Sequence, residues 1–369
     1  MKVMVVFGTR PEAIKMCPVI KEMKKYKEIE VIVCVTGQHK EMLTSVLDIF
    51  HVKPKYDLEI MRERQTLFDI TGDVLFGIKN IVEREMPDTV LVHGDTTSAF
   101  ATALACYYMK IPVCHVEAGL RTYNHYSPYP EESNRQAIDV ISDVFFAPTE
   151  NAKENLIKEG RTKESIYVTG NTVIDALKTT VYKDYTHKIL QWAEHSRLIL
   201  LTAHRRENAG NVMRDMFSAI KEVTECFEDI KVVYPVHMNP DIRKIAEEEL
   251  GDVERIRLIE PLDVIAFHNI MSRSYMVMTD SGGIQEEAPA LGKPTLVMRN
   301  TTERPEGVIA GTLKLVGTRK ENIVSAMKEL LTNQDVYYQM SETKNPYGDG
   351  KASKYILQVL LKKWGNEKC

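Results

Sequence analysis

The stretch Val3-Met4-Val5-Val6-Phe7-Gly8-Thr9-Arg10-Pro11-Glu12 carries the chain from an apolar segment straight into the start of a helix. Its first five residues show no polar alternation, which predicts a strand buried on both faces. Gly8 permits a tight turn after this strand, and Pro11 suits the first turn of a helix. Apolar residues then recur at helical spacing from Ala13 to Met23. A strand, a glycine turn and an amphipathic helix predict the opening unit of a parallel α/β sheet.

The same alternation of short apolar runs and longer helical stretches continues along all 369 residues. It predicts two doubly wound, Rossmann-like α/β units of roughly five or six strands each, facing each other across a cleft. We place the boundary near 170–171 or within the polar segment 183–197. The predicted strands are 3–7, 31–35, 89–92, 111–116, 144–147 and 166–168 in the first half, and 198–202, 231–236, 256–258, 275–279, 294–297 and 313–315 in the second.

Charge and cysteine usage restrict the class of protein. The sequence has 48 basic and 52 acidic side chains, a net charge of −4 and a pI near 6.2, which argues against a nucleic-acid binder. We identify no signal peptide and no run near the ~18 apolar residues of a membrane helix, so we expect no membrane association. The six cysteines form no C-x-x-C pair, which favours reduced thiols in the cytoplasm.

The segment after the first strand is a candidate anion site. Arg10 lies at the predicted helix N-terminus, and Lys15 follows about one turn further on. Free backbone amides, the helix dipole and a guanidinium together favour a phosphate. The alternative is that both cations are exposed on an ordinary helix. The sequence has neither G-x-G-x-x-G nor a P-loop pattern, so we predict neither a dinucleotide fingerprint nor a P-loop.

A second candidate phosphate site is the segment Asp280-Ser281-Gly282-Gly283-Ile284-Gln285-Glu286-Glu287. Ser281 offers a hydroxyl, and Gly282 and Gly283 let the backbone approach a ligand closely. Glu287 falls about one turn along the helix, where its carboxylate can accept from two ribose hydroxyls. The alternative is a tight turn with Glu287 as a solvated surface acid. Two such sites at equivalent places predict a diphosphate ligand between the two halves.

Three acids in the first half are candidates for proton transfer. Asp95 and Glu117 each follow a predicted strand, and Glu131 begins a helix. Acids at the carboxyl ends of parallel strands face the cleft, and clustered carboxylates raise one another's proton affinity. Alternatively, Asp95 caps a helix and Glu131 is a first-turn acid that the helix dipole favours.

Basic residues on loops of the second half complete the candidate site. His204 and Arg205 follow the first predicted strand of that half, and Arg304 follows a later one. The histidine can pass protons or hydrogen-bond a phosphate, and a structural histidine is the alternative. His237 also follows a strand, but no sequence neighbour supports a role for it. The sequence has no H-E-x-x-H, paired D-x-D or G-x-S-x-G pattern, so we predict no metal site and no serine nucleophile.

Several motifs together resemble the non-hydrolysing UDP-N-acetylglucosamine 2-epimerases, in family order over nearly the whole chain. They are Phe7-Gly8-Thr9-Arg10-Pro11-Glu12-Ala13-Ile14-Lys15, Val92-His93-Gly94-Asp95-Thr96, His115-Val116-Glu117-Ala118-Gly119-Leu120-Arg121, Pro130-Glu131-Glu132-Ser133-Asn134-Arg135, His204-Arg205-Arg206-Glu207-Asn208, Asp280-Ser281-Gly282-Gly283-Ile284-Gln285-Glu286-Glu287 and Thr302-Glu303-Arg304-Pro305-Glu306. The resemblance implies a glycosyltransferase-B-like fold. Its first domain is 1–170 plus the returning C-terminal helix 352–369, and its second, UDP-binding domain is 171–351. It implies reversible conversion of UDP-N-acetylglucosamine to UDP-N-acetylmannosamine, by elimination of UDP to 2-acetamidoglucal and re-addition.

The resemblance also assigns roles to individual residues. The family's acid/base groups correspond to Asp95, Glu117, Glu131 and His204, its UDP contacts to Arg10, Lys15, Ser281, Gly282, Gly283, Glu287 and Arg304, and its uracil contacts to Phe267 and Leu262. Bacterial relatives bind a second UDP-N-acetylglucosamine as an activator, at positions that correspond to Gln38, Glu41, Arg64, Glu131, Arg205 and His237. Glu41 stands where the bacterial pattern has a glutamine. The resemblance implies no metal or nicotinamide cofactor, and it implies a homodimer.

Three other functions fit parts of this pattern. A retaining or inverting glycosyltransferase has the same fold but needs an acceptor. A hydrolysing epimerase releases free N-acetylmannosamine. A nucleotide-sugar sensor binds without turnover, and the presence of Asp95, Glu117 and Glu131 in register with the family motifs argues against it.

Overall fold

The structure is a computed structural model that describes residues 1–37, 40–62, 64–205 and 208–365. Contacts divide the chain into two compact units, Met1–Lys178 with Gly348–Cys369 and Thr179–Tyr347. The chain therefore returns to its first unit after completing the second. We expected the first domain to end at 170 and the return to begin at 352. The contacts place these transitions at Lys178 and Gly348.

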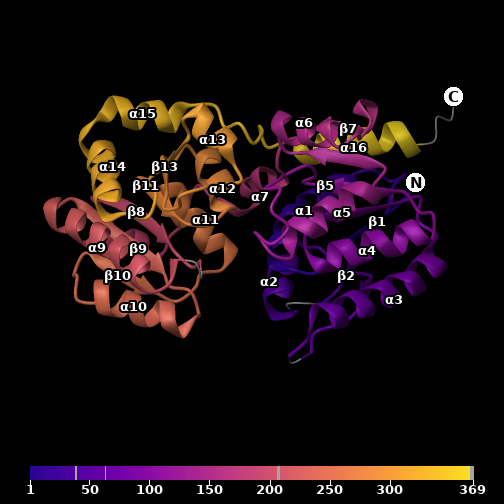
Figure 1. Ribbon diagram of the computed structural model, residues 1–369, viewed down its shortest axis with the longest axis horizontal. Coiled ribbons are helices and arrows are strands. Elements are labelled where there is room, and N and C mark those ends of the chain that lie inside the picture. The colour runs from indigo at the N-terminus through magenta and orange to yellow at the C-terminus, as the bar shows by residue number, and fades with distance from the viewer. Residues whose placement is uncertain (38–39, 63, 206–207, 366–369) are drawn as a thin grey trace. The chain divides into compact units, whose positions relative to one another are not determined.

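Within the described residues, the first unit contains a seven-stranded parallel sheet of order β3-β2-β1-β4-β5-β6-β7 with helices packed around it (Figure 1). Its strands are β1 (Lys2–Phe7), β2 (Glu30–Val35), β3 (Tyr56–Asp57), β4 (Thr89–His93), β5 (Val113–Val116), β6 (Val144–Ala147) and β7 (Ile166–Val168). Its helices are α1 (Arg10–Met23), α2 (Lys40–Phe50), α3 (Leu67–Glu85), α4 (Thr97–Tyr108), α5 (Glu131–Ile141), α6 (Glu150–Lys158) and α16 (Ala352–Trp364), with a short 3-10 helix, η1 (Lys163–Ser165). Helix α7 (Thr172–Thr180) carries the chain into the second unit.

The second unit repeats this plan with a six-stranded parallel sheet, counted over the residues that the structure describes, of order β10-β9-β8-β11-β12-β13. Its strands are β8 (Arg197–Thr202), β9 (Ile230–Pro235), β10 (Ile256–Ile259), β11 (Met276–Thr279), β12 (Thr295–Val297) and β13 (Leu313–Leu315). Its helices are α8 (Lys188–Trp192), α9 (Asn211–Cys226), α10 (Pro240–Leu250), α11 (Val264–Arg273), α12 (Ile284–Ala290), α13 (Pro305–Ala310), α14 (Lys320–Thr332) and α15 (Gln334–Glu342).

Burial explains why the apolar runs of the sequence predict these strands. Every side chain from Val3 to Phe7 is at most 1% exposed, because helices cover both faces of a parallel sheet. Each of the twelve predicted strands is present, with its ends within two residues of the predicted ones. The added strand, β3, has two residues and lies at the edge of its sheet, so it leaves no apolar run in the sequence.

Each sheet has a switch point, where the strand order changes direction. In the first unit this point lies between β1 and β4, which precede Gly8 and Gly94. In the second it lies between β8 and β11, which precede Ala203 and Asp280. Open α/β sheets bind ligands in the crevice at the carboxyl ends of the strands at such points. The fold therefore directs attention to the loops after these four strands.

The polar composition of the helices agrees with a chain that folds around two sheets. No helix in the described part of the chain combines the length and the apolar character that spanning a bilayer requires.

Helix α16 begins at Ala352, where the carboxylate of Asp175 accepts hydrogen bonds from the amides of Ala352 and Ser353 at 3.1 and 2.9 Å. These bonds satisfy amides that the start of a helix leaves without a partner. They fix the returning helix to α7 of the first unit.

Candidate active site

The loop between β1 and α1 is held in place by the buried carboxylate of Glu12. One of its oxygens accepts hydrogen bonds from the amides of Gly8 and Thr9 at 3.0 and 2.8 Å, and from the Thr9 hydroxyl at 2.8 Å. Its other oxygen accepts from the hydroxyl of Thr96, which caps α4, at 2.9 Å. A Cβ at Gly8 would lie 2.1 Å from the Thr36 hydroxyl, so only glycine fits this turn. Glu12 thus joins the loops after β1 and β4 and places Arg10 at the N-terminus of α1.

Sequence reasoning missed Glu12, although a signal for it exists. Thr9 and Glu12 form a capping box, with threonine before the helix and glutamate three residues later. This spacing is visible in the sequence and identifies Thr9 as the N-cap residue directly before α1.

Lys15 and Glu117 form a buried ion pair in the first unit. Asn171 donates to the same carboxylate oxygen at 2.7 Å, and His93 Nε2 lies 3.6 Å from it. Glu117 has a backbone φ of 68°, a conformation that a non-glycine residue rarely adopts. We predicted Lys15 as a phosphate ligand, which stays a prediction. In the structure Lys15 contacts the candidate acid/base residue Glu117. Two donors and a constrained backbone fix this carboxylate at the end of β5.

Asp95 and Glu131 lie at the ends of elements that meet through Arg135. The guanidinium of Arg135 donates to Asp95 through both Nε, at 3.1 Å, and Nη2. Its Nη1 donates at 3.0 Å to Glu132, which neighbours Glu131 in the first turn of α5. Burial opposes ionisation of Glu132, but donors from Gln136, from backbone amides and from Arg135 outweigh it and lower the pKa. The structure thus connects the α5 start, with the half-buried Glu131, to the Asp95 loop.

A second buried network, which we did not predict, supports the loop that carries Asp95. His115 Nε2 lies 2.7 Å from the carbonyl oxygen of Gly94, and its Nδ1 lies 2.6 Å from Asp139. Asp139 also accepts from Arg121 at 2.6 Å. Burial works against the charge of Asp139, but His115 and Arg121 outweigh burial and hold the pKa of that carboxyl below its usual range. No local sequence pattern links His115 to Asp139, because Asp139 lies on α5, 24 positions further along the chain.

In the second unit, the fully buried carboxylate of Asp280 organises the loop after β8. Its oxygens accept from the amides of His204 and Arg205, each at 3.0 Å, and from the side chain of Asn208 at 3.3 Å. The Nε of Arg205 donates to the Asp280 carbonyl at 2.9 Å. The Tyr234 hydroxyl donates to the Ala203 carbonyl at 2.6 Å. The two loops at this switch point are thereby fixed to each other.

The imidazole of His204 lies between Asp280 and His237. Its Nδ1 is 3.3 Å from Asp280, and its ring stacks on that of His237 with centroids 5.8 Å apart. Although 41% of the His204 side chain is accessible, the protein atoms packed around the ring lower its pKa, and His237 and Arg205 lower it further while Asp280 opposes them. A neutral imidazole can both donate and accept a hydrogen bond. His237, which had no support in the sequence, is therefore placed directly beside His204.

The loop Ser281–Gly283 lies against the side chains of Glu303 and Arg304. A Cβ at Gly282 would lie 2.8 Å from both Arg304 Nη1 and a Glu303 oxygen, so this glycine leaves room for them. Arg304 donates to Glu286 and to Glu303, each at 2.6 Å. Arg304 is thus buried at the edge of the predicted phosphate loop.

Glu303 is surrounded by cations. Besides Arg304, its carboxylate lies 2.9 Å from Arg299 and 3.8 Å from Arg205. Burial raises the pKa of Glu303, but Arg304 and Arg299 outweigh burial and lower it to about 2. Glu303 therefore stays ionised and fixes the direction of the neighbouring guanidinium groups.

Glu287 lies close to the same loop. A Cβ at Gly283 would be 3.6 Å from one Glu287 oxygen, and His268 Nε2 is 3.3 Å from the other. Leu262 and Phe267 are half-buried, and both pack against the apolar cluster that includes residues of β8 and β11. The unit thus places a carboxylate and an apolar surface next to the predicted phosphate loop.

The predicted activator residues are only partly within the described structure. Gln38 and the side chain of Glu41 lie outside the described residues. Arg64 and His237 are exposed, and Arg205 is half-buried.

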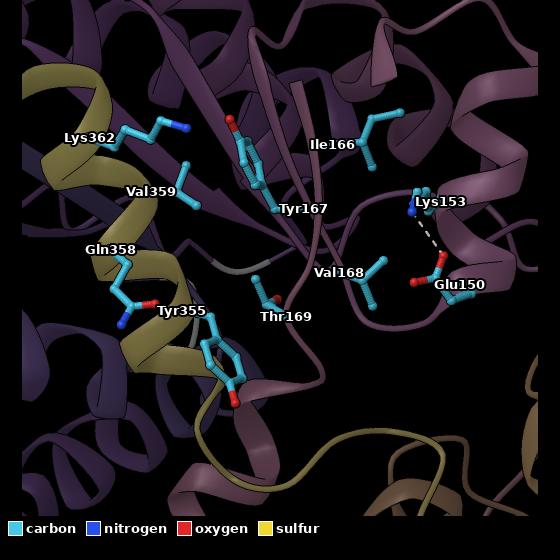
Figure 2. A pocket seen from close by; sticks show the side chains of 10 residues that line it. All are labelled: Glu150, Lys153, Ile166, Tyr167, Val168, Thr169, Tyr355, Gln358, Val359 and Lys362. Atoms are coloured by element: carbon cyan, nitrogen blue, oxygen red, sulfur yellow. Dashed lines mark hydrogen bonds and ion pairs between the residues drawn. The ribbon is translucent and has the colours of Figure 1, made fainter. Parts of the chain in front are cut away.

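One pocket of about 480 Å³ lies in the first unit between α6, β7 and α16 (Figure 2). Tyr167 and Tyr355 border it, and Glu150 pairs with Lys153 at 3.0 Å on one side. None of the described residues that line this pocket belongs to the predicted site. It is therefore a feature separate from the strand ends.

Two doubly wound sheets, with glycine loops, cations and carboxylates at their switch points, define a two-domain α/β protein. The chain belongs to the UDP-N-acetylglucosamine 2-epimerase family, whose model matches residues 21–361. It is 57% identical over 368 residues to the UDP-N-acetylglucosamine 2-epimerase of Bacillus subtilis. The matched region covers 100% of this chain and 97% of that protein.

Solved structures show the same similarity over both units. S. aureus MnaA, determined with UDP, matches with a TM-score of 0.92 at 49% identity and covers 100% of this chain and 98% of its own. The UDP-GlcNAc 2-epimerase of Neisseria meningitidis, bound to UDP-GlcNAc, matches with a TM-score of 0.91 at 49% identity and covers 98% and 100%. The predicted family and the two-domain, glycosyltransferase-B-like α/β fold are confirmed.

We predict that Glu303 stabilises the second unit in a pH-dependent way. Its folded pKa of about 2 is below that of the unfolded chain, near 4.3, so its contribution is complete above pH 5 and is lost as the pH falls. The difference in free energy of unfolding between wild type and Glu303→Gln should therefore shrink by roughly 1 kcal/mol between pH 6.5 and pH 3.5. Urea unfolding followed by Trp192 fluorescence in a Trp364→Phe background measures it.

The matched control is Glu254→Gln, which changes an exposed glutamate of the same unit. Its difference from wild type should not vary with pH. A constant difference for Glu303→Gln over the same range would contradict the assignment.

Proposed function

We propose that this chain catalyses the reversible C2 epimerisation of UDP-N-acetylglucosamine to UDP-N-acetylmannosamine. The observation that carries the proposal is 57% identity over the full chain to an epimerase of this name. A structure of a second relative, 49% identical, holds UDP-GlcNAc. These findings support an epimerase, which is an isomerase, over a glycosyltransferase or a hydrolysing enzyme.

The reaction we propose removes the C2 proton and eliminates UDP to give 2-acetamidoglucal. UDP then adds back while a proton is delivered to the other face of C2. Asp95, Glu117 and Glu131 form the acid/base set, and His204 is the fourth catalytic group, near the departing diphosphate. The fixed Glu117 carboxylate, with its two donors, supports this assignment, because a general base must be held in a defined position.

A sugar C2–H is a very weak acid, so a general base that contributes roughly 10²–10⁴ needs help. We propose that preorganised donors around the departing UDP supply much of the remainder. In the first unit these donors are Arg10 and Lys15. In the second they are His204 and the amides of Ser281–Gly283. The buried carboxylates that fix both loops support this role, because fixed dipoles need no reorganisation during the reaction.

The nucleoside contacts belong, in our proposal, to the second unit. Glu287 accepts from the ribose hydroxyls, and Phe267 contacts the uracil together with the backbone near Leu262. Arg304 contacts the UDP, at the edge of the glycine loop. Its contacts with Glu286 and Glu303 support a role that includes holding that loop in shape.

We also propose that UDP-N-acetylglucosamine is an allosteric activator. Its site comprises Gln38, Glu41, Arg64, Glu131, Arg205 and His237. The stack of His237 on His204 supports a site next to the catalytic group.

We predict that an activator site makes the rate rise sigmoidally with UDP-N-acetylglucosamine, and that UDP-N-acetylmannosamine alone is not converted. Steady-state rates from both directions test this. Arg64→Ala, which changes an exposed side chain, should shift the midpoint and leave the plateau unchanged. Hyperbolic kinetics in both directions would exclude the activator site.

A homodimer is our proposal for the assembly. Phe68 and Phe76 on α3 are 90% and 68% exposed, and Tyr107 and Tyr108 on the adjacent α4 are 56% and 67% exposed. Large apolar side chains gathered on neighbouring helices are typical of a protein interface. This surface supports a dimer through α3 and α4.

We predict a mass of twice 42.1 kDa by light scattering for the wild type, and a monomer for the double variant Phe68→Glu/Phe76→Glu. Buried carboxylates at a dimer interface are strongly unfavourable. Ile309→Glu, which changes an 83% exposed residue of the second unit, is the control and should remain dimeric. A double variant that also stays dimeric would place the interface elsewhere.

We propose a cytoplasmic location. Cys17, Cys34, Cys106 and Cys114 are buried free thiols. Burial raises the pKa of each to about 12, so these thiols stay protonated and unreactive. Free cysteines of this kind are typical of a reducing compartment.

The proposed reaction is tested by incubating the protein with UDP-N-acetylglucosamine in D₂O, without an acceptor, and following the sugar by NMR. We predict deuterium at C2 together with UDP-N-acetylmannosamine, because the proton that returns to C2 comes from solvent-exchanged groups. Free N-acetylmannosamine would indicate hydrolysis. An unchanged substrate would refute the catalytic proposal.

We predict that Asp95→Asn, Glu117→Gln and Glu131→Gln each lower kcat by at least ~10²-fold, because each removes a group that can exchange a proton. Affinity for UDP should stay within about threefold in Asp95→Asn and Glu131→Gln, to which we assign no contact with UDP. Glu117→Gln changes the ion-pair partner of Lys15, so its role is judged by kcat alone. Calorimetry and the NMR assay measure the two quantities. Glu154→Gln, an exposed glutamate on α6, is the matched control. A variant with a wild-type kcat would remove that carboxylate from the acid/base set.

A further inference from the structure

His268 is a buried histidine of the second unit to which neither the proposed reaction nor its substrate contacts assign a role. Its side chain is 2% exposed and lies on α11. One ring nitrogen, Nδ1, is 2.7 Å from the hydroxyl of Thr180. The other, Nε2, is 3.3 Å from an oxygen of Glu287. The ring thus stands between the last residue of α7 and the carboxylate that we assign to the ribose.

The chemistry of these neighbours fixes which nitrogen of His268 carries a proton. A carboxylate only accepts, so Nε2 must be protonated where it faces Glu287. A threonine hydroxyl can donate or accept, so it can satisfy Nδ1 whether or not that nitrogen carries a proton. A buried imidazole with a partner on each side is held in one orientation. His268 therefore presents a fixed N–H group to Glu287.

The carboxylate of Glu287 lies between this N–H group and the glycine loop. One of its oxygens faces His268, and the other is 3.6 Å from the position that a Cβ of Gly283 would occupy. A carboxylate that accepts from two neighbouring ribose hydroxyls must lie with its oxygens toward both of them. A long glutamate side chain on its own rotates freely, and ordering it on binding reduces affinity. A fixed donor that already holds one carboxylate oxygen reduces this loss of affinity.

We propose that His268 is a positioning residue that orients Glu287 for the ribose, and that it thereby sets the preference of the enzyme for a ribonucleotide over a 2′-deoxyribonucleotide. The inference rests on the proposed role of Glu287. Thr180 supports His268 from the opposite side, through the hydroxyl at Nδ1. The selectivity of the nucleotide site then depends on a residue that does not touch the nucleotide.

The test is isothermal titration calorimetry of the full chain with UDP and with 2′-deoxy-UDP. The quantity that matters is the ratio of the two Kd values, because a general loss of structure weakens both ligands alike. Wild type should bind UDP more tightly. In His268→Leu the ratio should fall by about 3- to 10-fold, chiefly through weaker UDP binding, as expected for one lost hydrogen bond.

Two more variants separate positioning from packing. His268→Gln keeps an N–H group near the position of Nε2 and should retain most of the wild-type ratio. His268→Asn has the same amide on a shorter side chain and should lose it. This pair keeps the test decisive if His268→Leu does not fold. Thr180→Val, which removes only the hydroxyl, should reduce the ratio by a smaller factor.

Glu287→Gln distinguishes failure of the inference from failure of the proposed function. If the wild type does not prefer UDP over 2′-deoxy-UDP, or if Glu287→Gln leaves that preference unchanged, the ribose role of Glu287 is wrong. The inference about His268 then falls with it. If Glu287→Gln abolishes the preference while His268→Leu and His268→Asn keep it, only the inference is overturned. Equal weakening of both ligands in the His268 variants would likewise overturn it.

Discussion

The carboxylate of Asp280 is shut off from water, and a buried carboxylate is stable only where donors surround it. The backbone amides of His204 and Arg205 meet this requirement in the second unit. In the first unit, Glu12 is surrounded in the same way by donors from the loop at Gly8. Each acid fixes a loop at the switch point of its sheet, where an α/β protein binds its ligand. The rest of the site depends on these two loops being rigid.

These acids also show how a chain of net charge −4 can accommodate the diphosphate site that we propose. The carboxylates of Glu12 and Asp280 accept hydrogen bonds from backbone amides inside the protein. Glu303 forms ion pairs with Arg299 and Arg304. The charge that a ligand meets is therefore local, and it differs from the sum over the sequence. We infer that the loops hold the departing UDP in a preorganised field while the carboxylates move the C2 proton. The two ends of helix α7 contact residues of the proposed site. Asn171, directly before the helix, donates to Glu117, and Thr180, its last residue, contacts His268.

The sequence predicted the elements well because the signals for them are local. Apolar runs such as 3–7 and glycines such as Gly8 determine a strand and its turn over a few residues, whatever the rest of the chain does. The partners of the site residues could not be predicted in this way. Lys15 pairs with Glu117 from 102 positions away, and His204 meets Asp280 from 76. Such pairs depend on which strands become neighbours, and no periodicity in the sequence encodes that order.

The most direct test of this account is positional isotope exchange. UDP-N-acetylglucosamine carries ¹⁸O at the oxygen that joins C1 to the β-phosphate, and ³¹P NMR follows the position of the label. If UDP is eliminated and held until it adds back, the account predicts that the label moves into the non-bridging oxygens of the β-phosphate, in recovered substrate and product alike. Complete retention of the bridging label through several epimerisations, with no 2-acetamidoglucal released, would contradict the account.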